Sequence, residues 1–147
     1  MKWRVVSVFL FVLAVVISAC SSATPTVSSN QPLKVADQAS LVKELEAAGA
    51  KVESGDSITQ EFFTPEGHTL KVNGADLQVY EYASADAMEQ EASKVAPDGG
   101  SVGTSMMMWI DKPHFYKAGR IMVLYLGTDK ALLELLNKAM GPQFAGQ

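Results

Sequence analysis

The first 19 residues limit what the chain can fold into, because they have the pattern of a segment that does not belong to a folded core. Lys2 and Arg4 precede an apolar run from Val5 to Ile17, which only Ser7 interrupts. Two positive charges and a 13-residue apolar run are typical of a secretory signal peptide. A transmembrane helix requires about 20 apolar residues, so this run is too short to cross a bilayer. We therefore expect residues 1–19 to be an export signal and the fold to form from the later part of the chain.

A cysteine motif closes this segment, with the sequence Ile17-Ser18-Ala19-Cys20. It resembles the lipobox of bacterial lipoproteins, in which an aliphatic residue and two small residues precede an invariant cysteine. The resemblance implies that Cys20 receives a diacylglycerol, that the signal is cut just before it, and that the new amino terminus is commonly acylated. More than one acyl chain anchors a protein stably, so we expect a cell-membrane protein, lipid-anchored on the extracytoplasmic face. The alternative is an ordinary signal peptide or an uncleaved anchor with a chance cysteine.

The mature chain is acidic and has no second cysteine. Cys20 is the only cysteine, so no intramolecular disulfide competes for it. Without residues 1–19 the chain carries ten basic and 16 acidic residues, a formal charge of −6. Phosphate contacts require clustered Lys and Arg, so we expect no nucleic-acid partner. The charge also disfavours flat binding to anionic lipid, so the lipid is expected to anchor the protein to the membrane.

Composition divides the rest of the chain into a tether and a domain. Residues 20–32 hold the cysteine and a stretch dominated by Ser, Thr and Pro without an apolar period, which is typical of a flexible tether. Residues 33–147 are close to the common domain size and are long enough for one core without disulfides. We expect a single monomeric domain with no cofactor and no metal.

Periodicity and turn residues predict three helices and six strands in this domain. The helices are expected over 38–49, 85–95 and 129–140, and the strands over 57–63, 68–73, 76–82, 105–110, 114–117 and 120–126. Asn73-Gly74 is a strong hairpin signal. The expected helix caps are Asp37 or Ser40, Ser84 and Thr128. The apolar face of the last helix is expected to consist of Leu132, Leu133, Leu135, Leu136 and Ala139.

A shift of 44 residues aligns the two halves, placing Leu77–Tyr82 on Ile121–Leu126 and Ser84 on Thr128. The result is a repeated β-β-β-α pattern preceded by an N-terminal helix, and both duplication and chance likeness remain open. The pattern predicts an α+β fold, with a mostly antiparallel sheet and helices on one face. The other face is then expected to be solvated or to cover a ligand or partner.

No motif in the chain specifies a reaction. The two histidines, His68 and His114, lie in different predicted strands, and no metal-ligand spacing accompanies them. The glycine-rich stretch 99–103 lacks the ending of a phosphate-binding loop, and no Gly-x-Ser-x-Gly elbow is present. A hydrolase-like envelope enzyme with a site assembled from distant residues remains an alternative.

The segment from Met106 to Arg120 has the most unusual composition. Thioethers and imidazole bind copper(I), so Met106, Met108 and His114 form a candidate soft-metal set, although methionine is also a routine core filler. A candidate binding surface consists of Trp109, His114, Tyr116 and Arg120, because exposed aromatic residues with an arginine are typical of binding hot spots. If they are buried they belong to the core, and this is the interpretation favoured for most of them.

A second resemblance covers most of the mature domain. Its residues are Val72-Asn73-Gly74, Val79-Tyr80-Glu81-Tyr82, Pro113-His114-Phe115-Tyr116, Gly119-Arg120 and the tail Gly141–Gly146. These segments look like those of a set of small, uncharacterised extracytoplasmic lipoproteins of bacteria, and the likeness brings no catalytic residues with it. The favoured interpretation is a non-catalytic binding or accessory module of the cell envelope, which meets an envelope protein or a small ligand.

Overall fold

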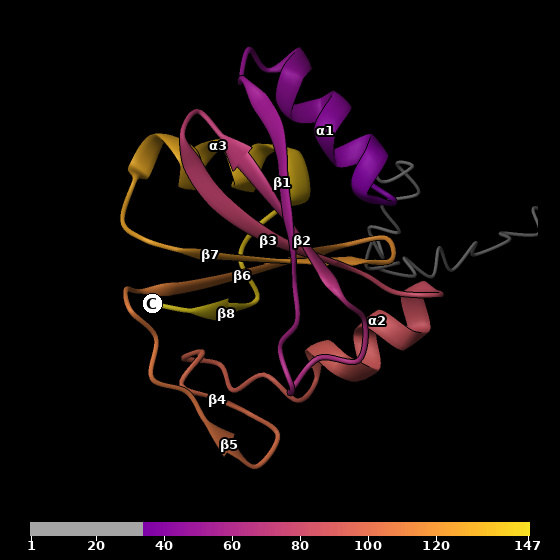
Figure 1. Cartoon of the computed structure of the whole chain (residues 1–147), viewed down its shortest axis with the longest axis vertical. Coiled ribbons are helices and arrows are strands. Elements are labelled where there is room, and N and C mark those ends of the chain that lie inside the picture. The colour runs from indigo at the N-terminus through magenta and orange to yellow at the C-terminus, as the bar shows by residue number, and fades with distance from the viewer. Residues whose placement is uncertain (1–33) are drawn as a thin grey trace, which may run out of the picture. The chain divides into compact units, whose positions relative to one another are not determined.

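The computed structural model describes residues 34–147 (Figure 1). The export signal, Cys20 and the tether lie outside these residues. The elements in chain order are α1 (Gln38–Ala47), β1 (Val52–Ile58), β2 (Gly67–Val72), β3 (Ala75–Glu81), α2 (Ala85–Ala92), β4 (Ser101–Val102), β5 (Ser105–Met106), β6 (Pro113–Ala118), β7 (Ile121–Leu126), α3 (Lys130–Met140) and β8 (Ala145–Gly146).

The main sheet has six strands in the order β1-β2-β3-β7-β6-β8, and every neighbouring pair is antiparallel. The strands β4 and β5 form a separate two-stranded ribbon. The predicted α+β class with a mostly antiparallel sheet is confirmed.

Local signals set the first helix and the first hairpin as predicted. The Asp37 carboxylate accepts the backbone N–H of Ser40, and the Ser40 hydroxyl accepts the N–H of Asp37, which closes a capping box. The Ser40 hydroxyl also donates to the Asp37 carboxylate at 2.7 Å, and this bond, followed by the one from the Ser40 N–H, lowers the pKa of Asp37. Asn73 and Gly74 both adopt positive φ, +53° and +92°, which lets β2 turn directly into β3.

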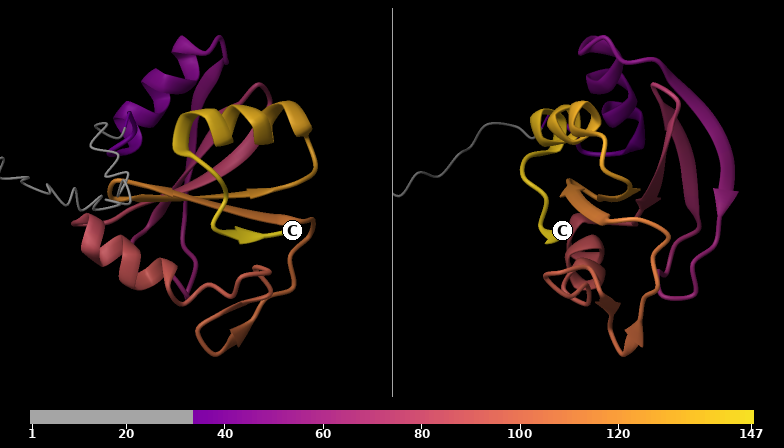
Figure 2. Two further views of the ribbon diagram at one scale, coloured as in Figure 1. Left: turned by 180° about the vertical axis from the view of Figure 1, so that it is seen from behind. Right: turned by 90° about the vertical axis from the view of Figure 1, so that its left-hand side faces the viewer.

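Both faces of the sheet are buried (Figure 2). On one face, which we call the helix-covered core, Leu41 and Leu45 of α1 meet α3 over strand residues such as Val79 and Val123. On the other face, the aromatic core, Met88 of α2 packs with aromatic side chains. The aromatic core residues are Phe63, Tyr80, Tyr82 and Phe115. The prediction that the second face is solvated or free for a partner is therefore wrong, because the chain covers that face itself.

Several boundaries differ from the prediction. The first strand is Val52–Ile58 and not 57–63, and the strand expected over 105–110 pairs only at Ser105–Met106. The second half therefore contributes two strands, β6 and β7, to the main sheet before α3. The repeated pattern is β-β-α, which occurs as β2-β3-α2 and as β6-β7-α3. Asp129, and not Thr128, caps α3 by accepting the N–H groups of residues 131 and 132. The buried stripe of α3 consists of Leu132, Leu136 and Met140, with Leu133, Leu135 and Ala139 only partly buried.

Candidate binding groove

The four residues of the predicted binding surface do not share one surface. Tyr116 is 1% exposed in the helix-covered core, and His114 is 5% exposed. Trp109 is half-buried beside Phe115 on the opposite face of the sheet, with ring centroids 5.9 Å apart. Arg120 lines a polar groove, whereas Trp109 lines a separate pocket with Met107 and Met108. The favoured interpretation, that most of these residues belong to the core, fits the structure.

The candidate copper set is not assembled. Nε2 of His114 donates to the Gly127 carbonyl at 3.0 Å, and Nδ1 lies 2.7 Å from the side-chain oxygen of Gln143. Both ring nitrogens are thus engaged in a buried site, whereas Met106 and Met108 point into solvent. Residues 34–147 contain no cluster of three or more His, Cys, Asp or Glu side chains arranged for a metal ion.

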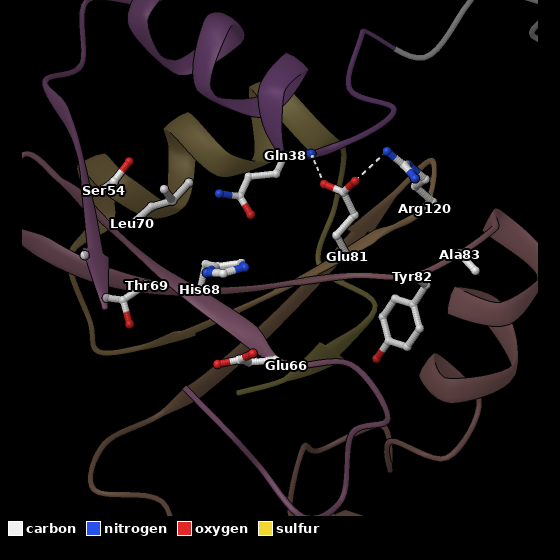
Figure 3. A pocket seen from close by; sticks show the side chains of 11 residues that line it. Gln38, Ser54, Glu66, His68, Thr69, Leu70, Glu81, Tyr82, Ala83 and Arg120 are labelled. Carbon is white, nitrogen blue, oxygen red and sulfur yellow. Dashed lines mark hydrogen bonds and ion pairs between the residues drawn. The ribbon is translucent and has the colours of Figure 1, made fainter. Parts of the chain in front are cut away.

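A polar groove of about 540 Å³ opens on the edge of the helix-covered face (Figure 3). This volume is within the range of small-molecule sites. Its walls come from the start of α1, from β1 and β2, from the end of β3 and from the β6–β7 turn. The lining residues are Gln38, Ser54, Gly55, Glu66, His68, Thr69, Leu70, Glu81, Tyr82, Ala83 and Arg120.

Glu81 joins three of these walls. One carboxylate oxygen lies 2.5 Å from Nη2 of Arg120, and the other accepts the backbone N–H of Gln38 at 3.0 Å. The Arg120 side chain is 44% exposed and that of Glu81 is 29% exposed, so both are partly open to solvent. Arg120 therefore has a fixed place at one end of the groove.

The backbone around Arg120 is fixed as well. The N–H of Arg120 donates to the carbonyl of Ala36 at 2.9 Å, and the carbonyl of Arg120 accepts the N–H of Tyr82 at 2.9 Å. Gly119, at φ +55°, lies so close to Ala36 that a Cβ would be 2.3 Å from its oxygen. The segment before α1 thus packs directly on the β6–β7 turn.

The rest of the groove presents exposed polar side chains. Glu66 and His68 are exposed and lie two residues apart at the start of β2. In the view of Figure 3, His68 lies between Glu66 and the end that holds Glu81 and Arg120. Neither Glu66 nor His68 has an ion-pair or side-chain hydrogen-bond partner in the part of the chain that the structure describes. These groups are open to a ligand.

Tyr82 lines the groove beside Glu81, while its ring belongs to the aromatic core. Burial raises the pKa of its hydroxyl well above the usual range, and the Glu91 carboxylate raises it further. The hydroxyl therefore stays neutral at physiological pH. It is buried and has no hydrogen-bond partner within residues 34–147.

The groove combines charges of both signs without a catalytic pair. Among the described residues, His68 makes no hydrogen bond to a serine or a carboxylate, so no nucleophile is activated there. Arg120 offers a cation with several donors, and Glu66 offers an acceptor-only carboxylate. This arrangement suits recognition of a charged ligand.

No protein-family model, curated protein or solved structure matches the chain. Within the described residues, every helix is too short or too polar to cross a bilayer.

Proposed function

We propose that this chain is an extracytoplasmic lipoprotein, anchored through Cys20, whose domain binds a small zwitterionic ligand in the groove. The ligand carboxylate lies against Arg120 and its ammonium group against Glu66, with His68 between them. The observation that carries this proposal is the fixed Arg120 facing a groove that also exposes Glu66 and His68.

The guanidinium of Arg120 is suited to hold a carboxylate. It carries five N–H donors in a rigid fork, and Glu81 is its ion-pair partner within the described residues. The pair with Glu81 orients the fork before a ligand arrives, which reduces the entropy lost on binding. Glu81 is therefore a positioning residue, and Arg120 is the residue expected to touch the ligand.

Binding is favoured over catalysis by the absence of an activated nucleophile in the groove residues that the structure describes. A hydrolase requires a nucleophile and a base within hydrogen-bond reach of each other. Ser54 and His68 both line the groove, but no hydrogen bond joins their side chains. A binding module requires only charges complementary to its ligand and a pre-formed cavity, and the groove supports both requirements.

The groove prediction is tested by titrating the mature chain with glycine and with glycylglycine while amide chemical shifts are recorded by NMR. We expect shifts at residues 66–69 and 119–121. Glu66→Gln removes the partner of the ammonium group, so the affinity should fall at least about tenfold. Glu134→Gln, an exposed change on α3, is the matched control and should leave the titration unaltered. Absence of shifts with both probes, or equal affinity in Glu66→Gln, would contradict the proposal.

The anchor prediction is tested by the intact mass of the protein from the membrane fraction. We expect a chain that starts at Cys20 and carries the mass of a diacylglycerol, with or without a further acyl group. Cys20→Ala should leave the protein either uncleaved or released from the membrane. A mature chain that starts elsewhere, or an unmodified Cys20, would overturn the anchor.

A further inference from the structure

The segment 106–110, which begins at the last residue of β5, carries apolar side chains on both of its sides. Met106, Met108 and Ile110 are 88%, 98% and 94% exposed, which makes them the most exposed large apolar side chains in the described part of the chain. The two residues between them, Met107 and Trp109, pack against the aromatic core. We call the three exposed side chains the apolar strip. Single exposed apolar residues are ordinary on a protein surface, whereas three large ones within five residues are a candidate interaction site.

The strip is held in place from its inner side. The N–H of Met107 donates to the carbonyl of Gly100 at 2.9 Å, and Nε1 of Trp109 donates to the carbonyl of Gly99 at 2.7 Å. The Trp109 ring makes edge contacts with Phe62 and Phe115, both at 5.9 Å between centroids. The exposed side chains are therefore presented to solvent by a fixed backbone.

The position and charge of the strip suit a bilayer surface. The β4–β5 ribbon lies at the end of the domain away from α1 (Figures 1 and 2). No charged residue occurs from Ser101 to Ile110, although the mature chain is strongly acidic. Insertion limited to the three exposed side chains would bury no charge, provided that the flanking Asp111 and Lys112, which line a pocket with Met108, stay in water. Burial of an unpaired charge is the main cost of entering lipid.

We infer that the apolar strip inserts into the interfacial region of the membrane, as a second contact beside the lipid on Cys20. This inference rests on the proposed anchor. The 15 residues from Cys20 to Lys34 make 14 Cα–Cα steps and reach at most about 50 Å, and a domain of this size has a radius of gyration of about 13 Å. The strip can therefore meet the membrane that holds the anchor. Tethering raises its effective concentration at the surface, so even weak insertion is sufficient.

Two residues of the chain allow contact between the apolar strip and a membrane to be measured. Trp109 is the only tryptophan after residue 19, and Cys20 is the only thiol. The chain from residue 20 onward can be coupled through Cys20 to a maleimide lipid in phosphatidylcholine vesicles. This coupling supplies an anchor whether or not the natural one forms. Quenching of Trp109 fluorescence by lipids with brominated acyl chains then reports insertion.

We expect strong quenching of Trp109 in the coupled wild-type chain. The double variant Met108→Ser, Ile110→Ser should lose at least about tenfold of the inserted population, because each side chain would no longer transfer apolar surface from water. The matched control is Ala131→Ser, an exposed change on α3, which should be quenched like the wild type. The double variant should keep its unfolding midpoint, since both changed side chains are exposed.

Three outcomes would overturn the inference. The first is an absence of quenching in the coupled wild-type chain, and the second is equal quenching in the double variant. The third is a vesicle-free dimer that the double variant abolishes, which would assign the strip to a second copy. Because the vesicle assay uses a synthetic anchor, an unmodified Cys20 in the membrane fraction would refute the natural anchor separately.

Discussion

Leu136→Ala is expected to lower the free energy of unfolding by about 2–5 kcal/mol. Leu136 is 0% exposed in the helix-covered core, where α3 packs over the sheet beside α1. Truncation removes buried apolar surface and leaves a cavity that the surrounding helices and strands fill only in part. The whole domain is expected to be stable by about 5–15 kcal/mol, so this single change is a large fraction of the total. The measurement is the urea unfolding midpoint at constant m-value.

The matched control is Lys138→Ala, two residues further along the same helix and exposed. It removes a cation from the last turn of α3 and no buried surface, so stability should change by no more than about 0.5 kcal/mol. If Leu136→Ala were equally mild, α3 would not be packed on the sheet as described, and its leucine stripe would face solvent or a partner.

The parts of the fold that the sequence predicted well are those with local signals. The capping box of Asp37 and Ser40, the Asn73-Gly74 turn and the Gly141 stop of α3 act within a few residues. Such signals place an element without knowledge of its neighbours. The α+β class is a consequence of the order of the helices and strands that these signals place.

The second buried face was missed because it depends on contacts between distant segments. β1 is a polar edge strand, exposed at residues 53–57, so it gave no alternation signal. Phe62 and Phe63 were assigned to a strand but lie in the turn region after β1, where they pack into the aromatic core. The continuous apolar run Ile121–Leu126 did hold the information, because a strand buried on both faces does not alternate.

The candidate site was harder to predict than the fold. His114 and Tyr116 were named as candidates for a binding surface, although the core was favoured for most of that set, and the structure buries both. Glu81 carried the better signal, since it falls on the same strand face as Leu77 and Val79. A charged residue on a core-facing row is more informative than an exposed one. Its partners Gln38 and Arg120 are far apart in the sequence, so only the folded chain brings them together.

Gly119→Ala is expected to destabilise the domain by about 2–5 kcal/mol, through two effects that can be separated. A non-glycine residue at φ +55° costs about 1–2 kcal/mol by itself. The new Cβ would also lie 2.3–2.6 Å from backbone atoms of Ala36, and this overpacking adds about 1–3 kcal/mol. Ala36 cannot move freely, because its carbonyl accepts the N–H of Arg120 and its own N–H donates to Ser40.

Gly103→Ala isolates the first effect. Gly103 has nearly the same φ, +59°, but a Cβ there meets nothing within 4 Å. Its cost should therefore stay near about 1–2 kcal/mol, and the difference between the two variants measures the contact with Ala36. Equal losses would mean that this contact contributes nothing. The two glycine variants also test whether the groove depends on the contact between Gly119 and Ala36. Displacement of Ala36 would move Arg120 away from its place beside Glu81. Gly119→Ala should therefore weaken the glycylglycine titration even where the domain is folded, whereas Gly103→Ala should leave it unchanged.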